Sequence, residues 1–278
     1  MKILITGATG FLGRALVDYY YQNNNEKWIR SNLVLLGHSE KRADFLRRKY
    51  NVEVLVGDVN NKSFLEKIFI NNKVEKVIHS SAVKYVSVSN ENPTYTIETN
   101  VFGSYNILTL CQKYGVSNLV GISTDKAINP TTIYGMTKKL MEEMYLEHGF
   151  TIVSGVNFFG SSGSVLDVWF EQFKTKKALT LTDKSCIRYF VEIEDVASIV
   201  VSSFGKNEIV APEKVLRVKI GDLLEIFMES FDYSEYIETG LLPGEKIEEE
   251  LSLGTNIVDA KSEDLRKMIS KWKLHNYY

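Results

Sequence analysis

The sequence predicts an α/β protein with a doubly wound parallel sheet, followed by a smaller C-terminal region of a different pattern. A short apolar strand, Lys2–Ile5, runs directly into a glycine-rich turn and then into a helical pattern. Further strand-helix units follow without an internal repeat or an extended linker, and this alternation favours right-handed crossovers within one parallel sheet. Beyond about residue 160 the alternation stops.

The composition excludes several classes of protein. The 278 residues are 44% hydrophobic, which is enough for a large core. The net charge is -2, with 33 basic and 35 acidic residues intermixed, so we expect neither a nucleic-acid-binding nor a membrane-binding surface. Cys111 and Cys186 lie far apart and the four histidines show no ligand spacing, so no disulfide framework or metal site is predicted. Because there is no long apolar run and no signal peptide, we expect a soluble cytoplasmic protein.

The glycine turn after the first strand indicates a dinucleotide-binding site. Gly7 permits a tight turn, Gly10 lets the backbone approach a pyrophosphate, and Gly13 allows close packing of the helix on the strand. The predicted cofactor-binding residues of this turn are Gly7, Thr9, Gly10, Phe11, Leu12 and Gly13. The alternative is a tight turn with no ligand.

The end of the second strand, Asn32–Leu36, indicates which dinucleotide is bound. A site that prefers NAD usually presents an acidic residue at this tip to the ribose 2′-hydroxyl, whereas here the tip is neutral and basic residues follow. The sequence therefore predicts NADP, with Ser39, Lys41 and Arg42 near the 2′-phosphate. The alternative for Lys41 is a solvated charge at the start of a helix.

The third and fourth strands, Val52–Val56 and Lys76–His79, are each followed by residues suited to the same cofactor. Asp58, with Val59, is placed to accept a hydrogen bond from the adenine amino group; the alternative is that Asp58 caps the next helix. The small residues Ser80, Ser81 and Ala82 leave room for a dinucleotide, and Asn100 is a polar group on the packed face of a long helix after Pro93. Lys84 lies near the sugar or phosphates, or is solvated.

The fifth strand, Asn118–Ile122, leads into the segment with the most chemistry. Thr124, Asp125 and Lys126 emerge at the carboxyl end of this strand, where open α/β sheets bind ligands. Tyr134 and Lys138 follow, four residues apart on one helix face, and an ammonium group beside a phenol favours the phenolate. The pair is thus a candidate acid/base unit. The alternative is an ordinary solvated helix face.

After the sixth strand, Thr151–Val156, the pattern changes, and this sets the expected domain boundaries. We expect residues 1–160 to form the NADP-binding domain, with a later segment near 190–204 returning to it. Residues 161–278 are expected to bind mainly the substrate.

Two motifs, Thr6–Gly13 and Tyr134–Lys138, resemble those of the extended short-chain dehydrogenase/reductases, which have a Rossmann fold and often modify nucleotide sugars. Further segments resemble the UDP-N-acetylglucosamine 4,6-dehydratases, particularly the short soluble ones that also invert C5. These segments are Ser123–Pro130, Gly160–Val165, Arg188–Phe190 and Leu242–Lys246. The chain departs from that pattern at Ser154, Tyr85 and Leu242, where arginine, histidine and arginine are usual.

The resemblance implies a mechanism in which NADP is tightly bound and recycled in each turnover. Tyr134, assisted by Lys138, takes the proton of the sugar's 4-hydroxyl, which Thr124 holds, while the C4 hydride passes to the nicotinamide. Lys126 removes the C5 proton and a protonated Asp125 donates to the departing 6-hydroxyl. The alternative for Asp125 and Lys126 is an ion pair in a surface loop. The implied product is UDP-2-acetamido-2,6-dideoxy-β-L-arabino-hex-4-ulose, for deoxyamino-sugar biosynthesis.

The resemblance also implies how the UDP-sugar is held and how the chain assembles. The implied substrate-binding residues are Lys84, Asn157, Ser161, Ser162, Ser164, Arg188, Glu245 and Lys246. Arg188 suits a diphosphate, and Glu245 with Lys246 would close over the nucleotide. A homo-oligomer, a dimer or an assembly of dimers, is expected through helices near residues 97–113 and 135–148.

Two alternative functions stay open from the sequence. One is a nucleotide-sugar epimerase or 4-keto reductase of the same fold, which would tolerate loss of Asp125 and Lys126. The other is a non-catalytic NADP-sensing protein, against which the presence of Tyr134 and Lys138 counts.

Overall fold

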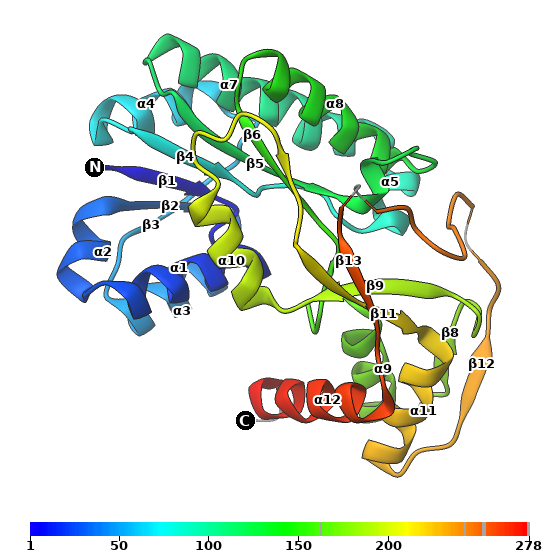
Figure 1. Cartoon of the computed structure of the whole chain (residues 1–278). Coiled ribbons are helices and arrows are strands. Elements are labelled where there is room, and N and C mark those ends of the chain that lie inside the picture. The colour runs from blue at the N-terminus through cyan, green and yellow to red at the C-terminus, as the bar shows by residue number, and fades with distance from the viewer. Residues whose placement is uncertain (162, 242, 252–253, 277–278) are drawn as a thin grey trace. The chain divides into compact units, whose positions relative to one another are not determined.

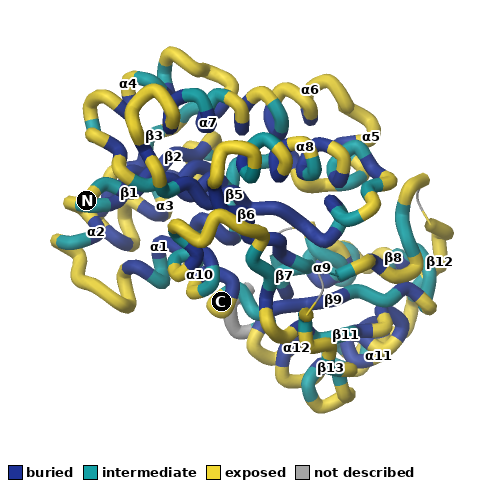
Figure 2. Tube along the Cα trace, turned by 45° about the horizontal axis from the view of Figure 1, so that its top comes forward, coloured by how far each residue is buried: buried dark blue, intermediate teal, exposed yellow. Residues whose placement is uncertain are grey.

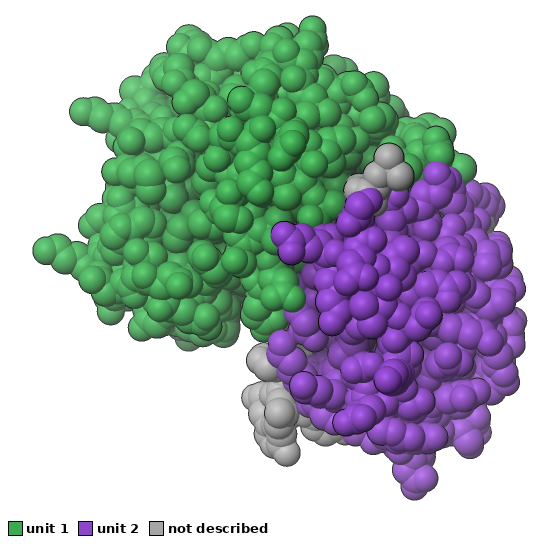
Figure 3. Space-filling model, viewed as in Figure 1, with its two compact units in different colours: residues 1–155, 193–211 green, residues 156–192, 212–278 purple. Residues whose placement is uncertain are grey.

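The computed structural model describes residues 1–161, 163–241, 243–251 and 254–276. The chain folds into two compact units (Figure 3). The first unit contains residues 1–155 and 193–211, and the second contains residues 156–192 and 212–278. The chain therefore leaves the first unit once, returns to it for a short segment, and leaves it again.

The first unit is built on a seven-stranded sheet in the order β10-β6-β5-β4-β1-β2-β3. Its strands are β1 (Ile3–Thr6), β2 (Leu33–Gly37), β3 (Val54–Val56), β4 (Lys76–His79), β5 (Asn118–Thr124), β6 (Thr151–Gly155) and β10 (Ile209–Val210). Every neighbouring pair is parallel. This order, which runs outwards from β1 in both directions, confirms the predicted doubly wound sheet.

Helices cover both faces of this sheet (Figure 1). One face carries α4, α7 and α8, and the other carries α1, α3 and α10. The helices and helical turns of the unit are α1 (Phe11–Asn23), α2 (Glu26–Asn32), α3 (Glu40–Tyr50), α4 (Lys62–Asn72), α5 (Val86–Glu91), α6 (Pro93–Ile97), η1 (Glu98–Phe102), α7 (Gly103–Lys113), η2 (Asp125–Ala127), α8 (Ile133–Glu147) and α10 (Ile193–Ser202). A parallel sheet requires such crossover helices, because each strand must return to the same edge before the next begins.

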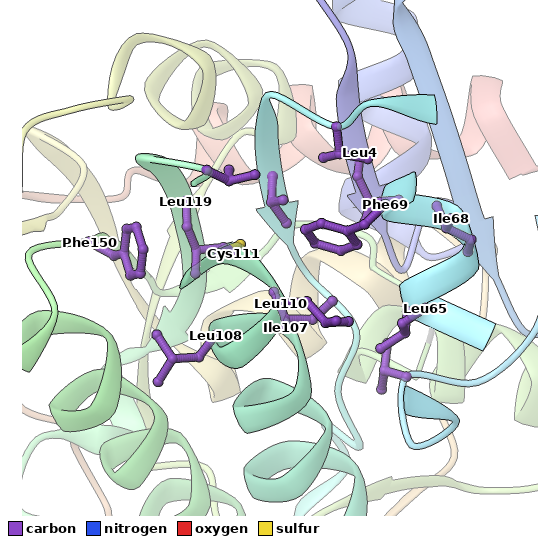
Figure 4. Close-up of a cluster of buried hydrophobic side chains, with 14 of the residues drawn as sticks. Leu4, Leu65, Ile68, Phe69, Ile107, Leu108, Leu110, Cys111, Leu119 and Phe150 are labelled. Carbon is purple, nitrogen blue, oxygen red and sulfur yellow. The ribbon is translucent and has the colours of Figure 1, made fainter. Parts of the chain in front are cut away.

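The central strands are apolar throughout because both of their faces are covered. Every residue of β1 and β2 is buried, and Figure 2 shows the sheet strands buried along most of their length. On one face, side chains such as Leu4 and Leu119 from the strands pack against Phe69 of α4 and Leu108 of α7 (Figure 4). This core fixes the strands whose carboxyl ends carry the predicted site.

Two of the differences from the predicted elements bear on the site. Strand β5 continues two residues beyond Ile122, because Ser123 and Thr124 pair with Ser154 and Gly155 of β6. The long helix predicted after Pro93 is divided into α6, the π-helical turn η1 and α7. A π-helical turn adds a residue to the helix and is frequent at functional sites.

The second unit is a smaller mixed structure. A four-stranded sheet has the order β13-β11-β9-β7, and a separate pair joins β12 to β8. Its elements are β7 (Asn157–Phe158), α9 (Val165–Lys174), β8 (Leu179–Leu181), β9 (Ile187–Val191), β11 (Lys214–Lys219), α11 (Ile220–Phe231), β12 (Tyr236–Glu238), β13 (Asn256–Asp259) and α12 (Ser262–Asn276). Aromatic side chains fill its core, with Trp169 and Phe227 fully buried and their ring centroids 5.4 Å apart.

Candidate active site

The glycine turn between β1 and α1 lies against the loop that follows β4. Gly7 has a φ of +69°, and a Cβ there would lie 2.8 Å from the backbone of both Ser80 and Ser81. The Ser80 hydroxyl donates to the carbonyl of Thr6 at 2.8 Å, which ties the two segments together. The structure thus brings together predicted cofactor residues that are more than 70 positions apart.

The rest of the turn has no space for larger side chains at its glycines. Gly10 donates to the carbonyl of Gly7 at 2.8 Å and serves as the N-cap of α1. A Cβ on Gly13 would lie only 2.2 Å from the Gly7 carbonyl oxygen, so glycine alone fits there. A turn with bare backbone at a helix N-terminus suits a pyrophosphate, and these residues therefore fit the predicted dinucleotide.

The loops after β2 and β3 present the other predicted cofactor residues. Ser39 caps α3, since its Oγ accepts from the backbone N–H of Arg42 at 3.4 Å. Lys41 and Arg42 are exposed in the first turn of that helix. Asp58 accepts from the N–H of Asn60 at 2.9 Å, and the cap of α4 is Asn61, so the alternative reading of Asp58 as that helix's cap is wrong.

Asn100, in the π-helical turn η1, is fully buried and all its amide hydrogen bonds go to the protein. Its side chain accepts from the N–H of Val83 at 2.7 Å and donates to the carbonyl of the same residue at 2.9 Å. It also donates to the Thr137 hydroxyl at 3.1 Å, and that hydroxyl donates to the carbonyl of Tyr134 at 2.9 Å. Asn100 therefore ties the loop after β4 to the start of α8.

A buried chain of hydrogen bonds, which was not predicted from the sequence, extends from Thr6 before the glycine turn to Asn100. His79, the last residue of β4, lies 2.8 Å from Thr6 Oγ1 through Nδ1 and 3.0 Å from Ser104 Oγ through Nε2. Ser104 in turn donates to the carbonyl of Asn100 at 2.6 Å. Burial and, secondarily, the charge of Lys138 lower the pKa of His79 to about 3, so this imidazole is neutral at physiological pH. The feature of the sequence that could have indicated this role is the position of His79 at the end of an apolar strand.

The end of β5 is pressed against the first turn of α8. A Cβ on Gly135 would lie 2.1 Å from the carbonyl oxygen of Lys126, so only glycine permits this approach. The helix start is fixed by Thr132, whose hydroxyl accepts from the N–H of Gly135 at 3.1 Å. The predicted triplet Thr124, Asp125 and Lys126 is thereby held beside Tyr134.

The three side chains of this triplet are linked by short contacts. Thr124 Oγ1 donates to Asp125 Oδ1 at 2.8 Å, and Lys126 Nζ lies 3.1 Å from the same oxygen. Asp125 is 2% exposed, and its other oxygen, Oδ2, is buried without a hydrogen-bond partner. An unpartnered buried carboxylate oxygen is costly, so it marks a place where a ligand group or a proton is expected. This burial argues against an ordinary surface ion pair.

Tyr134 and Lys138 share one face of α8 but are not hydrogen-bonded to each other. Lys138 is buried, and its Nζ donates to Met141 Sδ at 3.1 Å. Burial lowers the pKa of Lys138 to about 8, against a smaller opposite effect of Glu142. Burial raises the pKa of Tyr134, a hydrogen bond with Thr124 lowers it, and Asp125 raises it further. The phenol is therefore protonated at neutral pH in this state, and the expected stabilisation of the phenolate by Lys138 is not seen.

The predicted substrate residues of the second unit lie on and around β7 and β9. Asn157 donates to the carbonyl of Tyr189 at 3.0 Å. Arg188 donates to the carbonyls of Lys246 and Ile247, both at 3.1 Å, so this guanidinium holds the 246–247 backbone against β9.

The remaining predicted substrate residues lie in three loops. Ser164 is the N-cap of α9, and its Oγ is buried without a hydrogen-bond partner. Ser161 and Glu245 are half-buried, and Ser162 lies outside the described residues. In the first unit, the Lys84 ammonium lies 5.1 Å from the centre of the Tyr85 ring.

Curated relatives of the chain include proteins named for nucleotide-sugar chemistry. The chain is 28% identical over 265 residues to a UDP-N-acetylglucosamine 4,6-dehydratase (inverting) from Campylobacter jejuni, covering 89% of this chain and 76% of that protein. It is 28% identical to a UDP-glucose 4-epimerase from Rickettsia canadensis, covering 95% and 80%. It is also 31% identical to an uncharacterized membrane protein from Methanocaldococcus jannaschii, covering 92% and 81%. Within the described part of this chain, no helix has the length and apolarity needed to cross a membrane.

Solved structures share the fold over nearly the whole chain. Pen from Bacillus thuringiensis superposes with a TM-score of 0.87 at 25% identity, covering 98% of both chains. A UDP-glucose 4-epimerase from Thermus thermophilus, solved in complex with NAD, superposes with a TM-score of 0.81 at 20% identity, covering 98% of this chain and 99% of that one.

The fold and these relatives confirm the resemblance to short-chain dehydrogenase/reductases and to the UDP-N-acetylglucosamine 4,6-dehydratases. Residues 3–270 match the family described as polysaccharide biosynthesis protein. This match extends over nearly the whole of both units. The chain is a member of the polysaccharide biosynthesis protein family.

Proposed function

We propose that the protein is an NADP-dependent UDP-N-acetylglucosamine 4,6-dehydratase that also inverts C5. The single observation that carries this proposal is the buried Thr124-Asp125-Lys126 triplet held beside Tyr134 by the close contact at Gly135. An oxidation at C4 needs only a tyrosine, a lysine and a nucleotide. An added acid and base beside them fit the removal of water, which must take a proton from C5 and deliver one to the 6-hydroxyl.

The dinucleotide site is proposed to lie in the first unit, at the glycine turn. The bare backbone between Gly7 and Gly13 is suited to the pyrophosphate, and the neutral-to-basic tip after β2 is suited to the 2′-phosphate of NADP. When bound, NADP would accept a hydride from C4 and return it at C6. Asn100 contributes through the backbone of Val83, which it holds in place.

Each residue of the triplet has a defined task in this proposal. Thr124 orients the sugar's 4-hydroxyl toward Tyr134, which would take its proton as the phenolate. A bound oxidised nicotinamide would supply a positive charge that favours the phenolate against the effect of burial. The Lys126 amine takes the C5 proton, which the new 4-ketone makes acidic. Asp125 Oδ2, the unpartnered oxygen, carries the proton for the departing 6-hydroxyl. Return of a proton to the opposite face of C5 inverts that centre.

The second unit is proposed to bind the UDP portion. Arg188, Asn157 and Ser164 bring a cation and neutral hydrogen-bonding groups to β9, β7 and the start of α9. Because Arg188 also holds the backbone at Lys246, the loop carrying Glu245 and Lys246 is positioned by the same guanidinium.

A homodimer through α7 and α8 is also proposed. These helices pack side by side (Figure 1), and they and the turns before α7 expose several large apolar side chains. The exposed apolar residues are Ile97 of α6, Phe102 of η1, Tyr105 of α7, and Met136 and Leu140 of α8, which are 39–58% accessible. A second copy presenting the same helices would cover them with a self-complementary surface.

The experiment that tests the proposed reaction is incubation with UDP-N-acetylglucosamine in deuterated water without added reduced cofactor. Proton NMR and mass spectrometry would show a new C6 methyl group, loss of one water and deuterium at C5, and the ring couplings would report inversion. An unchanged substrate mass, apart from deuterium uptake, with new ring couplings would instead identify a 4-epimerase, the activity named for one relative. No reaction while NADP remains bound would favour the sensor.

A further inference from the structure

Arg14 lies in the first turn of α1 and takes no part in the proposed mechanism. Its guanidinium NH1 donates to the carbonyl of Thr9 at 3.2 Å, so the side chain lies along the glycine turn and not along the helix. The residue is half-buried, which is unusual for a cation without a carboxylate partner.

The glycine turn at this point is packed against the tip of β2. A Cβ on Gly37 would lie 2.4 Å from Thr9 Oγ1, so the Thr9 side chain rests on the Gly37 backbone. The N–H of Ala8 donates to the carbonyl of Leu36 at 2.9 Å. The head of Arg14 is therefore held at the edge where β2 ends and the chain proceeds to Arg42 in the first turn of α3.

The charges around Arg14 favour the binding of an anion. Burial, followed by the charge of Arg42, lowers the pKa of Arg14, while Asp18 and Tyr50 have smaller opposite effects. Among the residues that the structure describes, neither arginine forms an ion pair. Asp18, one turn further along α1, instead bonds Lys49 Nζ at 3.1 Å and the Tyr50 hydroxyl. Because Asp18 is already bonded to Lys49 and Tyr50, it offsets the repulsion between the two guanidinium groups only in part, and a bound anion would offset it further.

We propose that Arg14 is a specificity-determining residue that, together with Arg42, binds the 2′-phosphate of NADP. This inference rests on the proposed NADP dependence. It adds a residue outside the tip of β2, where the choice between NADP and NAD is normally made. A phosphate offers oxygens in the geometry that guanidinium forks recognise. The 2′-hydroxyl of NAD carries no charge, so NAD would leave both cations uncompensated at this edge.

The test compares the binding of NADP and NAD to the full-length protein after copurified nucleotide has been removed. Dissociation constants are measured by calorimetry for the wild type, R14M, R14K and the control R48M. Arg48 is an exposed residue of α3 that pairs with Asp44 at 2.9 Å, so it reports on the loss of one surface arginine. R14M is expected to weaken NADP binding by about 10- to 100-fold, the usual effect of losing a charge-assisted hydrogen bond, with NAD binding changed less than about threefold. R14K should recover part of the loss, and R48M should match the wild type.

The ratio of the two constants separates the possible outcomes. Equal weakening of NADP and NAD in R14M would mean that Arg14 only braces the turn through Thr9, and it would overturn the inference. An unchanged preference for NADP in R14M would overturn it as well, while the proposed NADP dependence would stand. If the wild type itself shows no preference for NADP, the cofactor proposal is wrong and the inference fails with it.

Discussion

Asp125 Oδ1 lies 3.1 Å from Lys126 Nζ, although adjacent residues of a β-strand would point their side chains to opposite faces. The 3₁₀-helical turn η2, which begins at Asp125, ends the strand alternation and brings both side chains together. A buried acid and a base are thus joined at one edge of the sheet.

Loss of either member of this pair should stop dehydration and spare the first hydride transfer. D125N and K126Q are each expected to lower the rate of C6-methyl formation by roughly 10²- to 10⁴-fold, as for the loss of a general acid or base. Proton NMR of the C6 methyl group and the absorbance of the reduced nicotinamide would be followed together. K139Q, which removes a half-buried lysine of α8 that pairs with Glu143 at 2.7 Å, should react at the wild-type rate. Normal methyl formation by D125N would assign the acid to another group.

Replacement of Lys138 should lower the activity and raise the stability of the protein. Its pKa falls from 10.5 to about 8 on folding, so below pH 8 the folded state must keep a buried ammonium that the unfolded state keeps in water. K138M should therefore be more stable than the wild type by roughly 3 kcal/mol at pH 7, with a rate lowered by about 10³-fold or more.

The pH dependence supplies the check on Lys138. The stability of the wild type should rise between pH 8 and 10.5, because there the unfolded state binds more protons than the folded state. K138M should lack this rise, so the free energies of unfolding of the two proteins, measured by urea denaturation, should converge as the pH approaches 10.5. A constant difference across this pH range would show that the buried ammonium is not its source.

Acid should destabilise the first unit through His79. Its pKa falls from 6.5 to about 3 on folding, so stability is complete above pH 6.5 and is lost as the pH falls toward 3. This group alone should remove roughly 3 kcal/mol between pH 6.5 and pH 4. H79N, measured by urea denaturation, should start less stable at pH 7 because Thr6 and Ser104 lose a partner, but should show a shallower decline. H148Q, at an exposed histidine, should follow the wild-type slope.

Charge introduced at the end of η1 and on the exposed face of α8 should separate the proposed dimer. Phe102 and Leu140 are 58% and 53% exposed, and F102E combined with L140E should yield a monomer in sedimentation-velocity experiments. I70E, at an equally exposed apolar residue of α4, should leave the assembly unchanged. A wild-type protein that sediments as a monomer at micromolar concentration would reject the dimer.

The fold was predictable because its signals are local. Apolar strands of three to seven residues, each followed by a helical pattern, specify a parallel sheet, and Gly7 and Gly13 fall where a Cβ has no space. The same locality placed Tyr134 and Lys138 on α8 and put Thr124 at the carboxyl edge of the sheet.

The partners of buried polar groups were not predictable. Whether Asn100 meets a cofactor or the Val83 backbone depends on how η1 packs against a loop 17 residues earlier. Arg188 likewise meets carbonyls 58 and 59 residues further along the chain. The state of the Tyr134 phenol was misjudged for a related reason. The spacing of residues on a helix gives the distance to a neighbouring charge. Burial has the larger effect on the pKa of Tyr134, and it arises only from the tertiary structure.

The return of the chain to the first unit matters for how the protein is made. Strand β6 is complete at Gly155, but its partner β10 and the helix α10 that packs on α1 are synthesised only after residue 192. On the ribosome, β6 therefore remains an open sheet edge while residues 156–192, the first segment of the other unit, are synthesised. A fragment cut at the apparent end of the dinucleotide-binding half would keep that edge permanently, so expression boundaries for this protein must include residue 211.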